Sequence, residues 1–418
     1  MKFYTSVTQH FGNILVCGYE NGKRFKEKVP YKPYLFLPTN EESKYRTIEG
    51  KSVKKQDFGS IKEARDFYKK FSEVENFDIY GYDKFPYVFI YDEYFRNLKY
   101  DTSLIKVCAL DIEVAKEEKY SDVSEASNKI TAITLYYKDI CFSLGYGDFT
   151  TSDPKIKYVK CRDEVHLLTN FIKLFTSDNY RPDVVTGWNI ESFDIPYLVN
   201  RIRRILGEDE AKKLSPFGVL NEREINNRFG KPQQIFEPLG LNVLDYLNLY
   251  KKFTYSQQES YKLDHICFVE LGEKKLDYSK YDSLDEMYEK DHQMYMEYNI
   301  HDCRLIWMLD GKMKLLELVY TFAYDSGINF IDSLTTVRAW DTIIHNYLLD
   351  RCTVIPKGKR NHVDRIPAGG FVKAPIVGMH DWVVSFDLTS MYPMRIIGSN
   401  ISPDTVVTKK MLLDISRE

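Results

Sequence analysis

Apolar and polar residues along the first 105 positions follow a period of two before they follow a helical period. Residues 14–20 are rich in β-branched and aromatic side chains, and Asn21-Gly22 comes directly after them. Asn-Gly suits the tight turn of a β-hairpin, so this segment is predicted to pair with the alternating residues that follow. Residues 61–74 carry apolar side chains at helical spacing. Residues 1–105 are therefore predicted to form a separate, β-rich N-terminal domain.

From position 105 the pattern changes to strands that alternate with helices. The mostly apolar segment 105–114 is typical of a buried strand. The alternation that continues to about residue 315 predicts an α/β domain. Further strands are predicted at 130–137, 140–144 and 183–187, and helices at 164–175 and 193–206.

Three later stretches are less regular. Residues 221–240 are rich in Asn, Gln, Arg and Pro, which indicates an exposed loop or hairpin. Residues 316–358 are mixed, and the Pro/Gly/basic segment 356–360 is typical of a linker. An apolar strand is then predicted at 381–387, followed by a helix at 388–397.

Composition changes this picture little. A length of 418 residues suggests about three domains, and 44% hydrophobic with 28% charged residues is typical of a folded protein. The net charge of −3 does not exclude nucleic acid, because local basic grooves matter more than the sum. The 7 cysteines form no Cys-x-x-Cys pair and are predicted to be reduced. The chain has neither a long apolar run nor a signal peptide, so we expect a cytoplasmic protein without a membrane span.

The first candidate site residues are Asp111 and Glu113. They lie two positions apart in the predicted strand 105–114, so they point to the same face of it. Two carboxylates on one face of a buried strand repel each other unless a cation lies between them. A surface strand would also carry such a pair, but the apolar neighbours argue against this alternative.

Three further residues complete the candidate set. Asp194 begins a predicted helix, where an acid also stabilises the helix dipole. Tyr298 and Asp302 are four apart in a helical stretch, so they share one face, which could equally be solvated. Four carboxylates without a Cys or His cluster favour Mg²⁺ or Mn²⁺. Two such ions ~4 Å apart support phosphodiester hydrolysis, and the Tyr298 hydroxyl could orient the attacking water.

The motifs resemble those of a known family. Asp-Ile-Glu at 111–113, Asn-x-x-x-Phe-Asp at 189–194 and Tyr-x-x-x-Asp at 298–302 resemble the 3′→5′ proofreading exonuclease of family B DNA polymerases. Ser-Phe-Asp-Leu-Thr-Ser-Met-Tyr-Pro at 385–393 resembles their first palm motif. The strings 186–196 and 243–253 are most similar to polymerases of the T-even-phage type.

The resemblance implies an α/β, multidomain fold. It comprises a discontinuous N-terminal domain at 1–105 plus 316–358, an RNase H-like exonuclease domain with a mixed β-sheet at 106–315, and an incomplete polymerase palm at 359–418. The segment 221–240 would be a hairpin that helps to separate the primer strand.

The resemblance also implies residue roles. Asp111, Glu113, Asp194 and Asp302 would hold two Mg²⁺ or Mn²⁺ ions, with Tyr298 beside them and Lys275 near the scissile phosphate. DNA, as a single-stranded 3′ end or a primer–template, would contact Asn189, Phe193, Gly369 and Gly370. Pro367 stands where relatives carry a tyrosine. In the palm, Asp387 would bind metal, and Leu388 and Tyr392 would bind nucleotide.

The second palm aspartate, the fingers and the thumb, which polymerisation also needs, lie beyond the matching motifs. We therefore expect a second polymerase chain to supply them, and no synthesis by this chain alone. A fragment of a longer protein is a further alternative, which the sequence does not distinguish from a naturally split gene. The expected location is the cytoplasm of an infected bacterial cell, if a phage encodes the protein. The alternative is a non-catalytic subunit that binds nucleic acid or acts as a scaffold in a replication complex. The presence of all four carboxylates argues against that alternative.

Overall fold

The computed structural model describes residues 1–71, 74, 77–95, 98–115, 122–226, 232–355, 369–402 and 405. The chain divides into two compact units, Met1–Gly358 and Lys359–Glu418.

The chain opens with a three-stranded antiparallel sheet of β1 (Lys2–His10), β2 (Asn13–Glu20) and β3 (Lys23–Pro30). Asn21 and Gly22 join β2 to β3 with φ values of 49° and 80°. Both angles are positive, as the tight hairpin turn requires, and Asn and Gly tolerate them best. The predicted hairpin is confirmed.

A second sheet joins distant parts of the chain, in the order β15-β5-β6-β4. Its only parallel pair in that order is β15 (Thr353–Val354) on β5 (Tyr45–Thr47), which brings the segment after residue 315 back to the N-terminal region. The other strands are β4 (Tyr34–Pro38) and β6 (Ser52–Asp57). The helical elements that follow β6 in the sequence are α1 (Ile61–Phe71), α2 (Phe85–Ile90), a π-helical turn (Tyr91–Phe95) and a 3₁₀ turn (Thr102–Leu104). The helix predicted at 61–74 is present and ends at Phe71.

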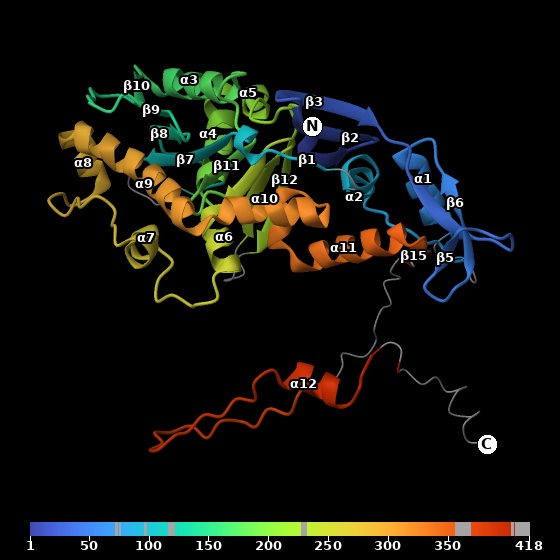
Figure 1. Cartoon of the computed structure of the whole chain (residues 1–418). Helices are drawn as coiled ribbons and strands as arrows, with labels where there is room; N and C mark the ends of the chain where they lie inside the picture. The colour runs from blue at the N-terminus through green and yellow to red at the C-terminus, as the bar shows by residue number, and fades with distance from the viewer. Residues whose placement is uncertain are drawn as a thin grey trace. The chain divides into compact units, whose positions relative to one another are not determined.

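The largest sheet has six strands in the order β10-β9-β8-β7-β11-β14 (Figure 1). β7 pairs antiparallel with β8 and parallel with β11, so the sheet is mixed, as predicted. The strands are β7 (Val107–Val114), β8 (Ile130–Tyr136), β9 (Cys141–Gly145), β10 (Ile156–Lys160), β11 (Val184–Gly187) and β14 (Asn242–Asp245).

Helices cover both faces of this sheet. Leu110 and Ile112 of β7 pack in one hydrophobic core with residues of α3 (Glu164–Thr176) and α4 (Asp194–Leu206). The long helix α9 (His292–Met313) contacts β7, β8 and β9, and Figure 1 shows it on the side of the sheet away from α3. The strand β7 is therefore buried between two helical layers, which is why its apolar residues are nearly continuous.

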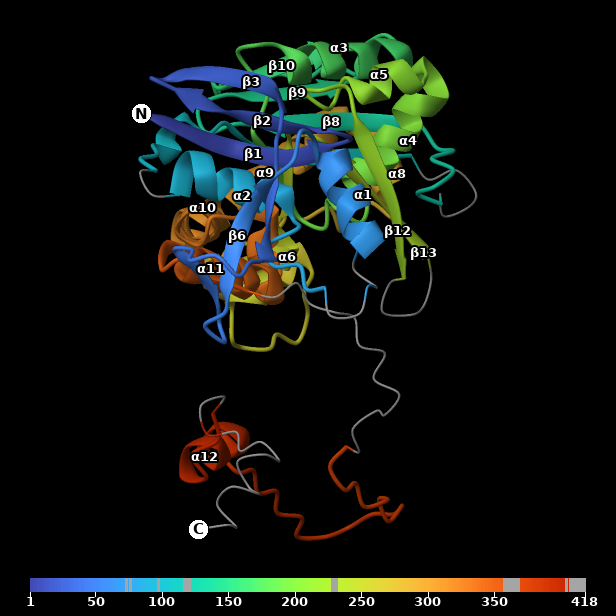
Figure 2. The same cartoon turned by 90° about the vertical axis from the view of Figure 1, so that its right-hand side faces the viewer.

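The polar segment 221–240 is a hairpin of β12 (Leu220–Asn226) and β13 (Pro232–Pro238), visible as a projecting ribbon in Figure 2. It was expected as a loop or hairpin, and residues 227–231 at its tip lie outside the described residues. Side chains in the middle of β13 are well packed, since Ile235 and Phe236 are buried.

The N-terminal region and the six-stranded sheet share one core, which includes Phe3 of β1, Leu244 of β14 and Leu305 of α9.

All seven cysteines are free thiols, and no helix in the described ranges is long and apolar enough to cross a membrane. The remaining helical elements are α5 (Glu208–Lys212), α6 (Tyr246–Phe253), α7 (Leu263–Leu271), α8 (Leu284–Lys290), α10 (Leu315–Ser326), a 3₁₀ turn (Phe330–Leu334) and α11 (Thr336–Asp350).

In the second unit, α12 (Met391–Gly398) overlaps the helix predicted at 388–397, beginning three residues later and ending one residue later. The strand predicted at 381–387 is wrong for this structure, because these residues have no regular secondary structure. The apolar side chains Val383, Val384 and Phe386 are 76%, 70% and 92% exposed. A strand needs a hydrogen-bonded neighbour, and the described residues of this unit form no other strand that could pair with them.

Candidate metal centre

Two carboxylates of the candidate site are held by the central strand of the large sheet. Asp111 and Glu113 alternate along β7 with Leu110 and Ile112, which pack against α3 and α4. The two acids therefore face the opposite side, toward α9, as the two-residue period predicts. Both are half-buried.

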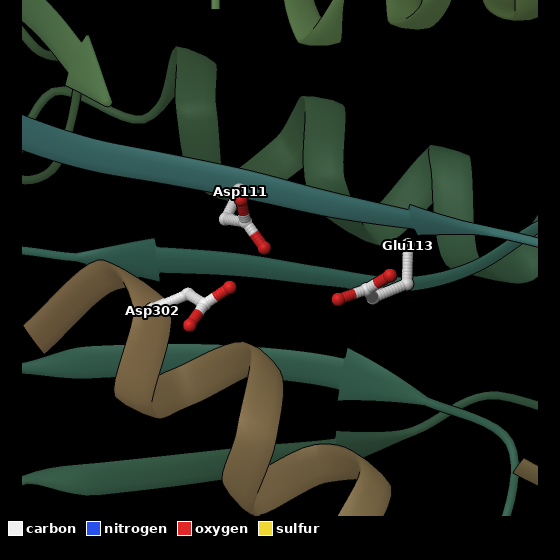
Figure 3. A group of neighbouring side chains, drawn as sticks. All are labelled: Asp111, Glu113 and Asp302. Carbon is white, nitrogen blue, oxygen red and sulfur yellow. The ribbon is translucent and has the colours of Figure 1, made fainter. Parts of the chain in front are cut away.

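Helix α9 brings Asp302 to the same place. One ligand oxygen each of Asp111, Glu113 and Asp302 lie within 4.8 Å of one another. Figure 3 shows the three side chains pointing into the space between the strand and the helix. Asp302 is 5% exposed. The structure therefore brings together three of the four predicted ligands from two rigid elements.

Asp194, the fourth predicted ligand, lies beside this cluster rather than in it. It is the first residue of α4 and is 4% exposed. Its Oδ1 accepts a hydrogen bond of 3.1 Å from the backbone N–H of Ile112. The pKa of the Asp111 carboxyl is raised first by burial and next by the negative charge of Asp194.

Burial raises the pKa values of all four acids, and the charges of Asp194 and Asp302 raise those of Asp111 and Glu113 further. Burial, followed by the charge of Asp302, raises the pKa of Glu113 to about 8. Burial also raises the pKa of Asp194 to about 7 and the pKa of Asp302 above its usual range. Burial and neighbouring negative charges raise the pKa of a carboxyl in this way, and a bound cation reverses the effect.

Lys275 and Tyr298 complete the polar surroundings of Asp302. Lys275 follows α7, and its ammonium forms an ion pair with Asp302 and donates to the Tyr298 hydroxyl at 3.2 Å. Burial, followed by the charge of Asp302, raises the pKa of the Tyr298 hydroxyl well above its usual range. The hydroxyl is therefore neutral at ordinary pH and can act only as a hydrogen-bonding group.

The donor set fits a hard divalent cation. Asp302 Oδ1 is buried and has no hydrogen-bond partner in the described part of the chain. Leaving such an atom unsatisfied is costly, and a metal ion would satisfy it. Every ligand atom in the cluster is a carboxylate oxygen, which is the preference of Mg²⁺ and Mn²⁺.

Sequence reasoning missed two residues that hold this site. Asn299 of α9 donates from Nδ2 to Asp111 Oδ2 at 2.6 Å. Asp245 accepts hydrogen bonds from the backbone N–H groups of Asn189 and Glu191 at 3.0 and 3.1 Å, which orders the loop before Asp194. Both are polar residues inside motifs quoted above, Asn299 within 298–302 and Asp245 within 243–253. The sequence does not indicate which residue each of them bonds to.

The other predicted residues are not members of the carboxylate cluster. Asn189 is exposed with φ of 64°, and the Phe193 ring packs 5.6 Å from that of Tyr197. The remaining predicted residues, Gly369, Gly370, Asp387, Leu388 and Tyr392, belong to the second unit and are exposed. Pro367 lies outside the described residues.

Comparison with known proteins agrees with the motifs. Residues 82–266 match the model for the DNA polymerase family B exonuclease domain. The chain is 35% identical over 97% of its length to the DNA-directed DNA polymerase of Escherichia phage RB69, covering 47% of that protein. It is 34% identical over 97% of its length to that of Enterobacteria phage T4, again covering 47%. A DNA polymerase of Pyrococcus glycovorans is 25% identical over 79% of the chain.

The chain thus spans about half the length of the two phage relatives. The mixed sheet and its helices are the RNase H-like fold that was expected of such an exonuclease domain. Nearly the whole chain aligns with the phage enzymes, and the motifs that carry the resemblance lie within the aligned length. The chain corresponds to the N-terminal part of a T4-type family B DNA polymerase and includes the region that matches the family B exonuclease domain.

Proposed function

We propose that this chain removes nucleotides from the 3′ end of DNA and so proofreads newly made strands. The observation that carries the proposal is the cluster of Asp111, Glu113 and Asp302, in which the buried Oδ1 of Asp302 has no hydrogen-bond partner among the described residues. We propose that these three residues and Asp194 hold two Mg²⁺ or Mn²⁺ ions. Ions held in this way lower the pKa of bound water and stabilise charge on the reacting phosphate.

The protein's own groups would then orient the reactants. The neutral Tyr298 hydroxyl can accept or donate a hydrogen bond, but its raised pKa keeps it protonated, so no phenolate is available to act as a base. We assign it the task of orienting the attacking water. Lys275, which contacts both Tyr298 and Asp302, would turn its ammonium to the scissile phosphate when the ions neutralise Asp302.

The surroundings suggest where the DNA strand lies. The exposed Asn189 and the half-buried Phe193 precede Asp194 in the loop that Asp245 orders. Rings and amides at such positions can stack on and hydrogen-bond to unpaired bases. We propose that they contact the single-stranded 3′ end, and that the hairpin of β12 and β13 helps to separate it from the template.

The first test is direct. The purified chain is expected to shorten 5′-labelled single-stranded DNA one nucleotide at a time from its 3′ end in Mg²⁺ or Mn²⁺, and EDTA is expected to stop it. A 3′-labelled substrate distinguishes the polarity, because the label is then released in the first step. Digestion from the 5′ end, or none in either metal, would refute the assignment.

We further propose that residues 359–418 are part of a polymerase palm, and that 1–105 with 316–358 form one N-terminal domain. The return of β15 to β5 supports the second statement. The exposed apolar residues at 383–386 support the first, since they suit a strand that pairs with further palm strands. We propose that a second chain supplies those strands together with the fingers and thumb. The assembly would act on primer–template DNA in the cytoplasm of an infected bacterium.

In such an assembly the two activities are expected to separate. Asp387→Ala should abolish primer extension and leave 3′ digestion unchanged, because Asp387 is the proposed palm metal ligand. Asp194→Ala should do the reverse. Both rates can be measured on one labelled primer–template, with and without dNTPs. An assembly that extends primers equally well with Asp387→Ala would contradict the role given to this residue.

A further inference from the structure

We infer that Asn299, oriented by Thr134, is a positioning residue that holds the Asp111 carboxylate for metal binding. This inference rests on the proposed function, which makes Asp111 a metal ligand. Neither Asn299 nor Thr134 is one of the predicted metal ligands. Asn299 lies on α9 between Tyr298 and Asp302, and Thr134 lies on β8.

The Asn299 side chain connects the helix to the strand. Its Nδ2 donates to Asp111 Oδ2 at 2.6 Å, and its Oδ1 accepts a hydrogen bond from the Thr134 hydroxyl. Asn299 and Thr134 are both fully buried. A buried amide is costly unless its groups are paired, and here both ends of the amide are used.

The sheet register puts Thr134 in the right place. Thr134 is the direct partner of Asp111 in the pairing of β7 with β8, so both side chains stand on the face that α9 covers. The hydroxyl of Ser143, the partner of Thr134 on β9, lies 3.1 Å from that of Thr134. A row of polar groups therefore crosses three strands beneath α9 and ends at Asp111.

This row determines which way the amide points. The two ends of an Asn amide have nearly the same shape but opposite hydrogen-bonding character. The Asp111 carboxylate can only accept, so the NH₂ end faces it, and the Thr134 hydroxyl donates to the oxygen end. The reverse orientation would place the amide oxygen against a carboxylate oxygen.

Asp111 needs such support. The charges of Asp194, Asp302 and Glu113 all act on its carboxylate, and repulsion favours turning the group away from them. The bond from Asn299 holds one oxygen in place and sets the plane of the carboxylate before a cation arrives. Groups that orient a metal ligand in this way typically contribute about 10- to 100-fold to metal affinity or activity.

The test measures metal binding without DNA, so it does not depend on digestion. Mn²⁺ is titrated into the EDTA-treated, dialysed chain, and free Mn²⁺ is followed by electron paramagnetic resonance. Asn299→Leu and Thr134→Val both keep the approximate volume and lose the hydrogen bonds. Each is expected to raise the apparent Kd for Mn²⁺ by about 10- to 100-fold. Thr134→Ser keeps the hydroxyl and is expected to restore the wild-type Kd.

Two control variants measure the general effect of removing buried polar groups. Thr342→Val and Asn346→Leu change side chains that are equally buried but lie on α11. They should leave the Kd for Mn²⁺ unchanged. If Asn299→Leu does not fold, the comparison of Thr134→Val with Thr134→Ser still decides the question.

The outcomes separate this inference from the proposed function. If Asp111→Ala abolishes Mn²⁺ binding while Asn299→Leu and Thr134→Val bind like the wild type, the positioning role is refuted and the metal centre stands. If Thr134→Ser binds as weakly as Thr134→Val, the hydroxyl is not what matters and the inference also fails. A wild-type chain that binds no Mn²⁺ would overturn both.

Discussion

Glu113→Gln is expected to lower the rate of 3′ digestion by at least ~10²-fold and yet to stabilise the metal-free protein at alkaline pH. The rate falls because an uncharged amide replaces a carboxylate ligand, so charge on the reacting phosphate is less well stabilised. Single-turnover digestion of 5′-labelled single-stranded DNA at saturating Mg²⁺ measures this loss.

The stability effect follows from the pKa of Glu113. Burial and the charge of Asp302 raise this pKa from 4.5 to about 8 in the folded chain. Between these two values the folded protein retains a proton that the unfolded protein has lost, so folding stability decreases as the pH rises. Glu113→Gln removes this group. In EDTA its advantage over the wild type should therefore grow from about pH 4.5 to about pH 8 and then level off.

Divalent metal should reverse the order of stability. An ion that binds only the folded state stabilises the wild type by mass action, and the variant lacks one of its ligands. Thermal unfolding with EDTA and with Mg²⁺ at pH 8 compares the two cases. Glu297→Gln on the exposed side of α9 is the matched control and should change neither rate nor stability. A Glu113→Gln protein that digests DNA at the wild-type rate would exclude Glu113 from the catalytic site.

A graded series can then rank the other residues. Tyr298→Phe keeps the ring in its buried position but removes the hydroxyl that contacts Lys275. Its loss of rate should be smaller than that of Glu113→Gln, because water orientation contributes less than a metal ligand.

Local periodicity was sufficient to predict much of the metal centre. The two-residue period put Asp111 and Glu113 on one face of a strand, and the structure has them there. Asp194 was expected at a helix start and is the first residue of α4. In these cases the relevant geometry lies within one element, so neighbouring residues along the chain determine it.

What could not be predicted depends on contacts between elements. That Thr134 lies opposite Asp111 follows from the register of β7 and β8, which no local pattern specifies. The role of Asn299 depends in turn on that register. The strand expected at 381–387 failed for the same reason, because an apolar, β-branched segment forms a strand only where a partner is available.

Arg201→Met is expected to reduce the free energy of unfolding by about 3–5 kcal/mol. Arg201 lies on α4, is 7% exposed, and binds both carboxylate oxygens of Glu164 at 2.8 and 2.6 Å. Its Nη1 also donates to the carbonyl oxygens of Ala126 and Ser127 at 2.9 and 2.7 Å. Methionine fills part of the volume, but it leaves two carbonyl groups without this donor and the Glu164 carboxylate without its counter-charge, with the backbone N–H of Ile130 still bonded to it. Urea unfolding of the chain in EDTA measures the change.

Arg204→Met is the matched control, because Arg204 lies on the same helix but is exposed and bonds only to the Glu125 carbonyl among the contacts in the described structure. A surface change of this kind should shift the free energy of unfolding by no more than about 0.5 kcal/mol. The double variant Arg201→Met/Glu164→Met should recover part of the loss, since no charge is then left unpaired. If Arg201→Met is as stable as Arg204→Met, the pair does not anchor α4. Because α4 begins at Asp194, a loosened helix should also weaken Mn²⁺ binding, whereas Arg204→Met should not.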